Sequence, residues 1–362
     1  MSERKRYQLA TLPEPGAVAS IFDVAKAAGV GTSTVSRVLN GHPSVRPATS
    51  LRVREAMQTL GYRPNAMARG LVAGRSHTLG LALYALHNPF FGLLAEGIAT
   101  AARARGYDVL ITLSDESHRG EMLTTLVERR VDGVFLAPIH LEDELAEIRK
   151  AGMKAVVLST ADREGVGTAD RLISFVGTDN VRGGYLATRH LIDLGHRRIS
   201  FLGYDRNNLA GRDRLQGYMH AHQDRNIALD PALILQDLLS MEDARGAARR
   251  LLIAPQPPTA IFAVNDEFAI AAFQATTDLG RRVPDEVALV GFDDIPFAAC
   301  LPVPLTTVAL PIAEIGRVAT NLLIDQIEHP DHPAQHVMIQ SELIVRGSCG
   351  AYPGSESDPD AL

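Results

Sequence analysis

The amino-acid sequence predicts an all-α helix-turn-helix head followed by an α/β body of two Rossmann-like lobes. Three observations predict it. Residues 20–40 contain two short helical patterns on either side of a glycine turn. From Thr78 onward, apolar β-rich runs alternate with helical patterns in two successive sets. The net charge also changes sign between the first 75 residues and the rest of the chain.

The first helix of the head is marked by local signals. Ser20 and Asp23 form a capping-box pattern, which predicts a helix from Ile21. Gly29 supplies the left-handed residue that ends this helix. Four apolar residues fall at helical spacing and are expected on one buried face: Phe22, Val24, Ala25 and Ala28.

A second short helix is expected from Thr32, and Asn40-Gly41 marks its end. Two short helices joined by a tight glycine turn form a helix-turn-helix, whose second helix can lie in the DNA major groove. Small polar groups and one guanidinium on that helix suit contacts with base edges and phosphates. The residues assigned to this contact are Thr32, Ser33, Thr34, Ser36, Arg37 and Asn40.

A third helix is expected to start near Pro47, to run to Leu60 and to end at Gly61. It closes a small core whose expected members are Val45, Val53, Met57, Leu60 and Tyr62.

The charge distribution separates the head from the body. Residues 1–75 contain 11 Lys and Arg against 4 Asp and Glu, whereas the remaining chain contains 25 basic and 38 acidic residues. A basic head attracts the phosphates of nucleic acid, although a merely solvated basic face has the same composition. The chain carries a net charge of −6 and an acidic body compatible with solubility.

The body is expected to contain two parallel sheets, because strands separated by helices of 10–20 residues form βαβ units. The first set of predicted strands is 79–86, 107–113, 133–139, 154–159 and 173–177. The second set is 198–204, 233–239, 260–265, 287–294 and 337–345.

Short stretches of the sequence resemble the LacI/GalR family of bacterial transcription regulators. They are DVAKAAGV, TVSRVLNG, LGYRPNAMARGL, NPFF at 88–91, VND at 264–266 and VGFDD at 290–294, and the resemblance extends over residues 20 to 347. It implies a two-lobed body like that of periplasmic sugar-binding proteins, with chain crossings near 178, 307 and 335.

The expected organisation follows from this resemblance and from composition. Residues 1–19 are a disordered extension, 20–63 the DNA-binding domain, 64–75 a hinge helix, 76–348 the effector and dimerisation domain, and 349–362 a disordered tail. Lobe 1 is expected to comprise about 76–178 and 307–335, and lobe 2 about 179–306 and 336–348.

The resemblance makes residues 64–75 a helix that folds only when paired with its dimer mate on DNA. It implies that Leu71 is a wedge in the minor groove, flanked there by Asn65, Ala68 and Arg69. Physical chemistry agrees with conditional folding, because so short a segment containing Gly70 is a poor isolated helix. A plain linker is the alternative.

Ligands of open α/β sheets bind beyond the carboxyl ends of strands. By resemblance, Phe90 and Phe91 flank an effector, and Arg214, Asn265 and Asp293 hydrogen-bond it. Ser159 and Met241 stand at further pocket positions, where relatives often carry Asp and an aromatic residue. Aromatic faces with these polar groups suit a sugar, and a nucleobase is the alternative. As structural alternatives, Phe91 fits a core and Asn265 or Asp293 fits a helix cap.

The sequence contains no GxSxG, HExxH, Walker A or CxxC motif, so we expect no enzyme, cofactor or metal site. The histidines at 220, 222, 329, 332 and 336 are expected in solvent rather than on a metal. With two cysteines, no apolar export signal and no apolar run of spanning length, we expect a cytoplasmic protein. The expected function is an effector-controlled repressor that binds a palindromic operator as a homodimer; a solute-binding receptor is the main alternative.

Overall fold

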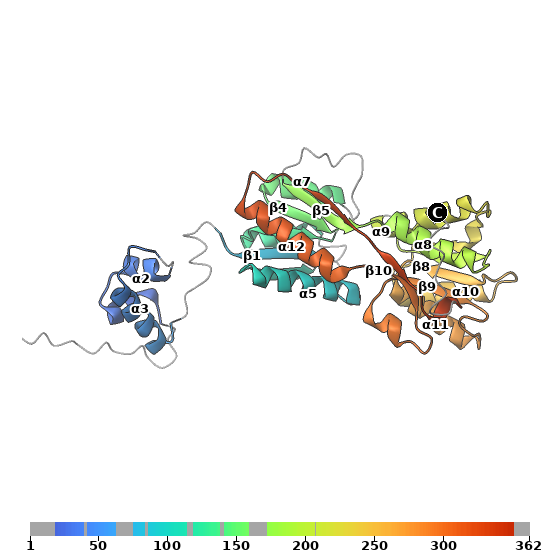
Figure 1. Ribbon diagram of the computed structural model, residues 1–362, viewed down its shortest axis with the longest axis horizontal. Helices are drawn as coiled ribbons and strands as arrows, with labels where there is room; N and C mark the ends of the chain where they lie inside the picture. The colour runs from blue at the N-terminus through green and yellow to red at the C-terminus, as the bar shows by residue number, and fades with distance from the viewer. Residues whose placement is uncertain are drawn as a thin grey trace, which may run out of the picture. The chain divides into compact units, whose positions relative to one another are not determined.

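The structure is a computed structural model that describes residues 19–39, 42–62, 75–83, 86–113, 119–137, 141–158, 172–206 and 208–350 (Figure 1). It divides into two compact units, Met1–Ser76 and His77–Leu362. The first unit contains the head, and the second contains two α/β lobes.

The head consists of α1 (Ile21–Ala28), α2 (Thr32–Leu39) and α3 (Pro47–Thr59). The predicted capping box is present: the Ser20 backbone N–H donates to Asp23 Oδ2 over 2.8 Å, and Asp23 N–H donates to Ser20 Oγ. Gly29 adopts φ 65°, the left-handed conformation that ends α1. The sequence therefore predicted all three helices from their end signals.

The core of the head contains the residues expected from the sequence, with one exception. Val24, Val35 and Val53 are fully buried, and Val45, Met57, Leu60 and Tyr62 pack against them. Phe22 was expected on the buried face of α1 but is 72% exposed. It precedes Val24 by two residues, which turns it well away from the side that packs on α3.

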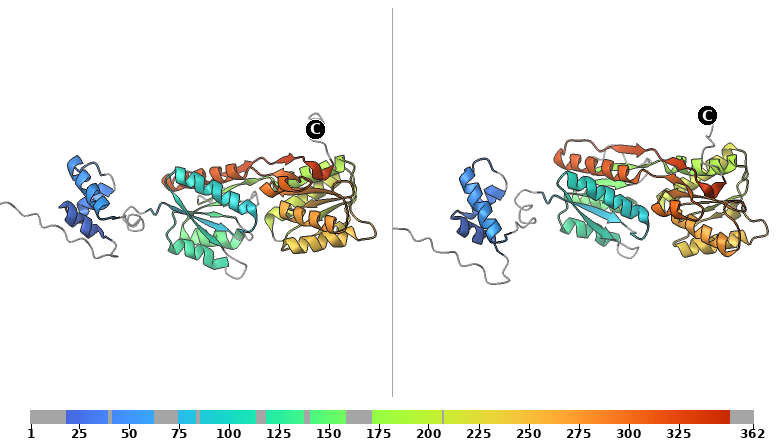
Figure 2. Two further views of the ribbon diagram at one scale, coloured as in Figure 1. Left: turned by 90° about the horizontal axis from the view of Figure 1, so that it is seen from below. Right: turned by 60° about the horizontal axis from the view of Figure 1, so that its bottom comes forward.

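Lobe 1 is built on a parallel sheet in the order β11-β5-β4-β3-β1-β2. Its helices cover both faces, with α5 and α12 packed together on one side and α6 and α7 on the other (Figure 2). The strands are β1 (Thr78–Leu83), β2 (Asp108–Leu113), β3 (Gly133–Leu136), β4 (Lys154–Leu158), β5 (Ile173–Thr178) and β11 (His336–Ile339). The helices are α5 (Pro89–Ala104), α6 (Arg119–Glu128), α7 (Leu141–Ala151) and α12 (Ile312–Glu328).

Lobe 2 repeats this plan with the strand order β12-β10-β9-β8-β6-β7, in which only β12 runs antiparallel to its neighbour. Its strands are β6 (Ile199–Leu202), β7 (Ile234–Leu235), β8 (Ala260–Ala263), β9 (Ala288–Asp293), β10 (Thr306–Ala309) and β12 (Glu342–Ile344). Helices α8 (Asn180–Asp193) and α9 (Leu209–Asp224) pack as one pair, and α10 (Met241–Leu252) and α11 (Asp266–Asp278) as another.

The C-terminal part of the body differs from the sequence prediction. The predicted strand 337–345 is two strands, because β11 pairs with β5 in lobe 1 whereas β12 pairs with β10 in lobe 2. The strand β10 was missed, and it also belongs to lobe 2. The last two crossings therefore lie after Ala309 and after Ile339, a few residues later than the predicted crossings near 307 and 335.

Close packing of α8 on α9 fixes the position of the residues considered below. A Cβ added at Gly184 would meet the Arg214 carbonyl oxygen at 2.2 Å, and one added at Gly217 would meet the Val181 carbonyl oxygen at 2.0 Å. Glycine at these two positions lets the helix backbones touch. The backbone of Arg214 is consequently held directly against α8.

Candidate functional site

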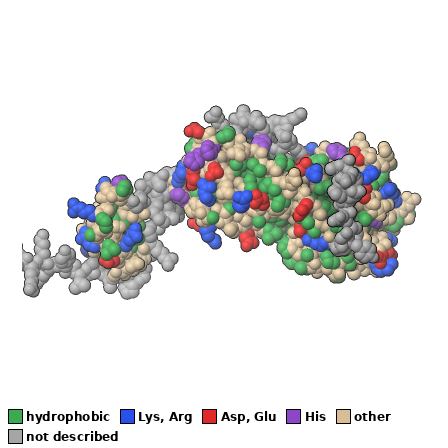
Figure 3. All heavy atoms as spheres, in the orientation of Figure 1, with side chains coloured by type: hydrophobic (Ala, Val, Ile, Leu, Met, Phe, Trp, Pro, Cys, Tyr) green, Lys and Arg blue, Asp and Glu red, His purple; other side chains and the backbone are tan. Residues whose placement is uncertain are grey.

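The outward face of α2 carries the residues that were predicted to contact DNA. Val35 and Val38 are buried and anchor the helix on the core of the head. Ser33 and Arg37 are exposed, and Thr32, Thr34 and Ser36 are half-buried. Asn40, Asn65, Ala68, Arg69 and Leu71 lie outside the described residues, so their predicted contacts stay predictions. Figure 3 shows that Lys and Arg outnumber Asp and Glu on the visible face of the head.

Arg214 is the centre of a buried polar group in lobe 2. It projects from α9 and its side chain is 7% exposed. Its Nε donates to Asn180 Oδ1 over 2.9 Å, its Nη1 donates to the Val264 carbonyl over 2.5 Å, and its Nη2 lies 3.2 Å from Asp293 Oδ1. The guanidinium also lies over the Phe292 ring, 3.7 Å from its centroid. Contacts from α8, β9 and the end of β8 thus fix the guanidinium in one orientation.

Asn265 caps α11 with one end of its side-chain amide and contacts Tyr204 with the other. Its Oδ1 accepts a hydrogen bond from Phe268 N–H over 2.8 Å, which caps α11. Its Nδ2 donates to the Tyr204 hydroxyl over 2.5 Å, so the other half of the amide orients an aromatic side chain that follows β6. The helix-cap alternative for Asn265 is therefore correct, yet the cap leaves the amide nitrogen facing Tyr204. Burial raises the pKa of Tyr204, which keeps its hydroxyl protonated.

Asp293 ends β9 in a backbone conformation that is unusual for a residue with a side chain, at φ 103°. It is 4% exposed. Burial raises its pKa to about 6, although the positive charge of Arg214 acts in the opposite direction. Backbone strain at a buried carboxylate is typical of functional sites. We name Asn180, Tyr204, Arg214, Asn265 and Asp293 together the Arg214 cluster.

Two further acidic residues lie beside this cluster. Asp266 is fully buried, with its oxygens accepting hydrogen bonds from Thr307 Oγ1 over 2.6 Å and from Ile295 N–H over 2.8 Å. Burial raises the pKa of Asp266 well above its ordinary value, and the negative charge of Asp293 raises it further. Glu267 is only half-buried; burial raises its pKa and nearby His87 of lobe 1 lowers it.

The aromatic pair predicted to flank the ligand belongs to lobe 1. Phe90 and Phe91 stand in the first turn of α5, which Asn88 caps by accepting a hydrogen bond from Phe90 N–H over 2.9 Å. Their rings meet edge to face, with centroids 5.2 Å apart. Both are half-buried, so neither is simply part of the core. They lie three and four residues after His87, whose charge lowers the pKa of Glu267.

Three of the seven predicted effector residues thus meet in the Arg214 cluster. Met241 stands on another element, in the first turn of α10, and is 37% exposed. Ser159 lies outside the described residues. Sequence reasoning missed Asn180 and Tyr204, because no motif marks them and only the fold brings them to Arg214.

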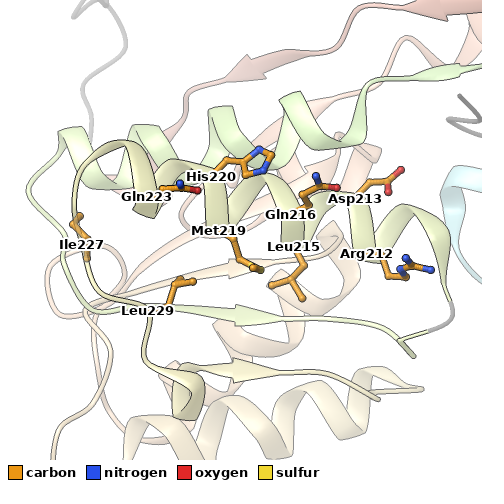
Figure 4. Close-up of a pocket in the computed structure, with 9 residues that line it drawn as sticks. All are labelled: Arg212, Asp213, Leu215, Gln216, Met219, His220, Gln223, Ile227 and Leu229. Atoms are coloured by element: carbon orange, nitrogen blue, oxygen red, sulfur yellow. The ribbon is translucent and has the colours of Figure 1, made fainter. Parts of the chain in front are cut away.

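A groove of about 710 Å³ runs along the other side of α9 (Figure 4). Its lining contains none of the predicted effector residues; it comprises Arg212, Asp213, Leu215, Gln216, Met219, His220, Gln223, Ile227 and Leu229. Within the described residues, no group of three or more His, Cys, Asp or Glu side chains is arranged to hold a metal ion. No helix in the described ranges combines the length and apolar content needed to cross a bilayer.

Comparison with known proteins agrees with both parts of the fold. Residues 20–65 match the model of bacterial regulatory proteins of the lacI family, and residues 188–349 match a periplasmic binding protein-like domain. The repressor PurR of Aliivibrio fischeri strain MJ11 is 32% identical over 335 residues, which cover 91% of this chain and 98% of that protein. The chain belongs to the LacI family of bacterial regulatory proteins.

Other LacI-family members support the same conclusion. The ribose operon repressor of Escherichia coli K12 is 33% identical, over 91% of this chain and all of that protein. The lac repressor dimer bound to operator and the anti-inducer ONPF has a TM-score of 0.82 at 25% identity, over 92% of this chain and 100% of that one. A LacI-family regulator of Enterococcus faecium with bound ribose has a TM-score of 0.66 at 27% identity, over 75% and 98% of the two chains.

Proposed function

We propose that this LacI-family protein is a transcriptional repressor that binds a palindromic operator as a homodimer under the control of a small-molecule effector. The observation that carries the proposal is that α2 has one buried apolar face and one exposed polar face. Val35 and Val38 anchor the helix, while Ser33 and Arg37 face outward on a basic head. A helix held on the core in this way can enter the DNA major groove as a rigid element and contact base edges there.

The Arg214 cluster and the pair Phe90 and Phe91 form the proposed effector site. Guanidinium, carboxylate and amide groups at the carboxyl ends of β8 and β9 give orientation, and aromatic faces from lobe 1 give apolar contact. The E. coli relative is a ribose operon repressor, and the E. faecium structure contains ribose. We therefore place a sugar-like effector between the lobes, where it would couple their closure to the hinge at 64–75.

We propose that a second copy docks on the edge of lobe 1. β2 is an edge strand of its sheet, and it exposes Ile111 and Leu113, which are 41% and 56% accessible. Apolar side chains repeated on an open edge favour association with another chain. Replacing Leu113 by Glu is expected to give monomers in sedimentation velocity and weak operator binding. The similarly exposed Leu194→Glu serves as the matched control.

Operator binding is the direct test of this function. DNA fragments selected by the full chain define the operator, and fluorescence anisotropy then measures affinity over a range of salt concentrations. A repressor loses affinity steeply as salt rises, because phosphate contacts release counterions. A solute-binding receptor, the main alternative, would retain no fragment. We assign no catalytic role to the chain and place it in the cytoplasm, where its DNA target lies.

A further inference from the structure

A short basic cluster precedes the head in the sequence. Arg4, Lys5 and Arg6 stand next to one another, and Glu3 is the only acidic residue among the first 13. The cluster lies outside the described residues and before residues 20–65, the segment that matches the lacI family. It therefore belongs to a part of this chain that the family match does not cover.

The structure fixes the point where this segment joins the head. Ala19 is buried, with 7% of its surface exposed, and Ser20 is held by its capping box with Asp23 at the start of α1. In helix-turn-helix proteins the first helix crosses the DNA backbone while the second lies in the major groove. The segment is consequently attached to the first turn of the helix that approaches the phosphates.

The length of the segment sets how far the cluster can reach. Thirteen residues, 7–19, separate Arg6 from Ser20. At ~3.3–3.6 Å per residue, a chain of this length spans at most about 45 Å. One turn of B-DNA is about 34–36 Å long. The cluster can therefore reach the DNA backbone beyond the phosphates next to α1, up to about one helical turn away.

The head already has the charge that attracts DNA. Its described residues, 19–39 and 42–62, contain five Lys and Arg against two Asp and Glu, and all five basic residues are exposed. The cluster would add three positive charges, of which Glu3 offsets one. Additional positive charge on this unit strengthens its attraction to phosphates rather than to a neutral partner.

The acidic body is the competing partner for the cluster. Residues 76–362 contain 38 acidic against 25 basic residues, spread over two lobes. Duplex DNA carries one negative charge per ~1.7 Å of its axis, so about 26 phosphates lie along 45 Å of duplex. A duplex held by the head also presents these phosphates at high effective concentration, because the contact is then intramolecular. Bound DNA is therefore the stronger partner.

We propose that Arg4, Lys5 and Arg6 form a basic arm that contacts DNA phosphates beside the half-site read by α2, and that this arm adds sequence-independent affinity to operator binding. Basic segments at the N-terminus of a chain commonly bind nucleic acid in this way. The inference rests on the proposed function, because it concerns the DNA complex of that regulator.

The salt dependence of operator binding measures the arm directly. The variant of the full chain combines Arg4→Ala, Lys5→Ala and Arg6→Ala, and fluorescence anisotropy follows binding from about 50 to 200 mM salt. Each phosphate contact contributes about 0.9 to the slope of log affinity against log salt. The slope is expected to fall by about 2.7 if one arm of the homodimer contacts DNA and by about 5.4 if both do. Affinity at the lowest salt is expected to fall roughly tenfold or more.

Three exposed arginines of lobe 2, Arg212, Arg249 and Arg250, provide the matched control. Replacing them together with Ala removes the same charge from the chain and is expected to leave the slope unchanged. An arm variant with the wild-type slope would contradict the inference. Equal decreases in the arm and control variants would also contradict it, since net charge alone would then explain the loss. Tighter operator binding by the arm variant would overturn it in favour of a contact between the cluster and the body.

An unrelated duplex of the same length separates phosphate contact from base recognition. The arm variant is expected to lose affinity for this duplex and for the operator by the same factor, because phosphates are common to both. A loss confined to the operator would overturn the phosphate contact. If wild-type protein binds neither duplex at low salt, the proposed function itself fails, whereas operator binding with an unchanged slope in the arm variant removes only the arm.

Discussion

Arg214 and Asp293 form a buried ion pair whose strength can be measured by a double-mutant cycle. The three variants are Arg214→Met, Asp293→Asn and the combination of both. Either single change leaves the other group desolvated without its partner, since both side chains are less than one-tenth exposed. The double change removes both charges together, so no buried charge is left without its partner.

The expected magnitudes follow from the geometry. Two unit charges 3.2 Å apart attract by about 5 kcal/mol at an effective dielectric constant of ~20, before the cost of desolvation. Removing one partner of a buried pair costs about 3–5 kcal/mol. Since the double variant does not bury a lone charge, we expect it to cost about 2–3 kcal/mol less than the sum of the two single changes.

The assay is urea unfolding of the full chain, followed by far-ultraviolet circular dichroism. Measurements are made at pH 8, where Asp293 is ionised because its pKa is about 6. The slope of free energy against urea must be the same in all four proteins for the cycle to report stability alone. Costs of the two single changes that simply add in the double variant would refute the interaction between these groups.

Three further predictions can be checked independently. Gly184→Ala is expected to destabilise the body strongly, because its Cβ would meet the Arg214 carbonyl at 2.2 Å, whereas Gly246→Ala, whose nearest neighbour lies at 3.6 Å, should stabilise it by about 0.5–1 kcal/mol in urea unfolding. The folded-state pKa of Asp293, about 6, lies above its ordinary value of 3.8. Folded protein therefore takes up a proton as pH falls from about 6 to 4, so this group raises the free energy of unfolding in that window while effector affinity, measured by calorimetry, falls. Arg37→Ala is expected to weaken operator binding and to reduce the slope of log affinity against log salt by about 1; an unchanged slope would mean that Arg37 does not contact a phosphate.

The head was predictable from sequence because its determinants are local. Ser20 and Asp23 lie three residues apart, and Gly29 ends α1 where a left-handed residue is needed. Phe22 is the exception. An apolar side chain was assigned to the core although the packed face of an eight-residue helix is too narrow to include it.

The body was predictable as two parallel sheets, but its crossings were not. In residues 337–345, apolar and polar residues alternate in a way that predicts one strand. Nothing in that pattern marks the point after Ile339 where the chain passes from lobe 1 to lobe 2. The strand β10 has two threonines in four residues and follows a proline-rich segment, so its sequence resembles a loop. Its burial comes from pairing with β9 and β12, which are contacts distant in sequence.

The proposed effector site was predicted by resemblance to a family rather than by a pattern in the residues. Asn180, Tyr204 and Arg214 come from α8, the loop after β6 and α9, and only the packed lobe brings them together. The ion pair between Arg214 and Asp293 could not be predicted from the sequence, because the two residues are distant in the chain and only the fold brings them together.

Measuring operator affinity with and without effector tests most directly the claim that an effector bound between the lobes controls DNA binding. In the full chain, a saturating effector is expected to change the operator dissociation constant by about 5–150-fold, the usual range of allosteric coupling. Linkage requires operator DNA to change effector affinity by the same factor. If the operator dissociation constant is the same whether the effector site is empty or saturated, effector control of operator binding is contradicted.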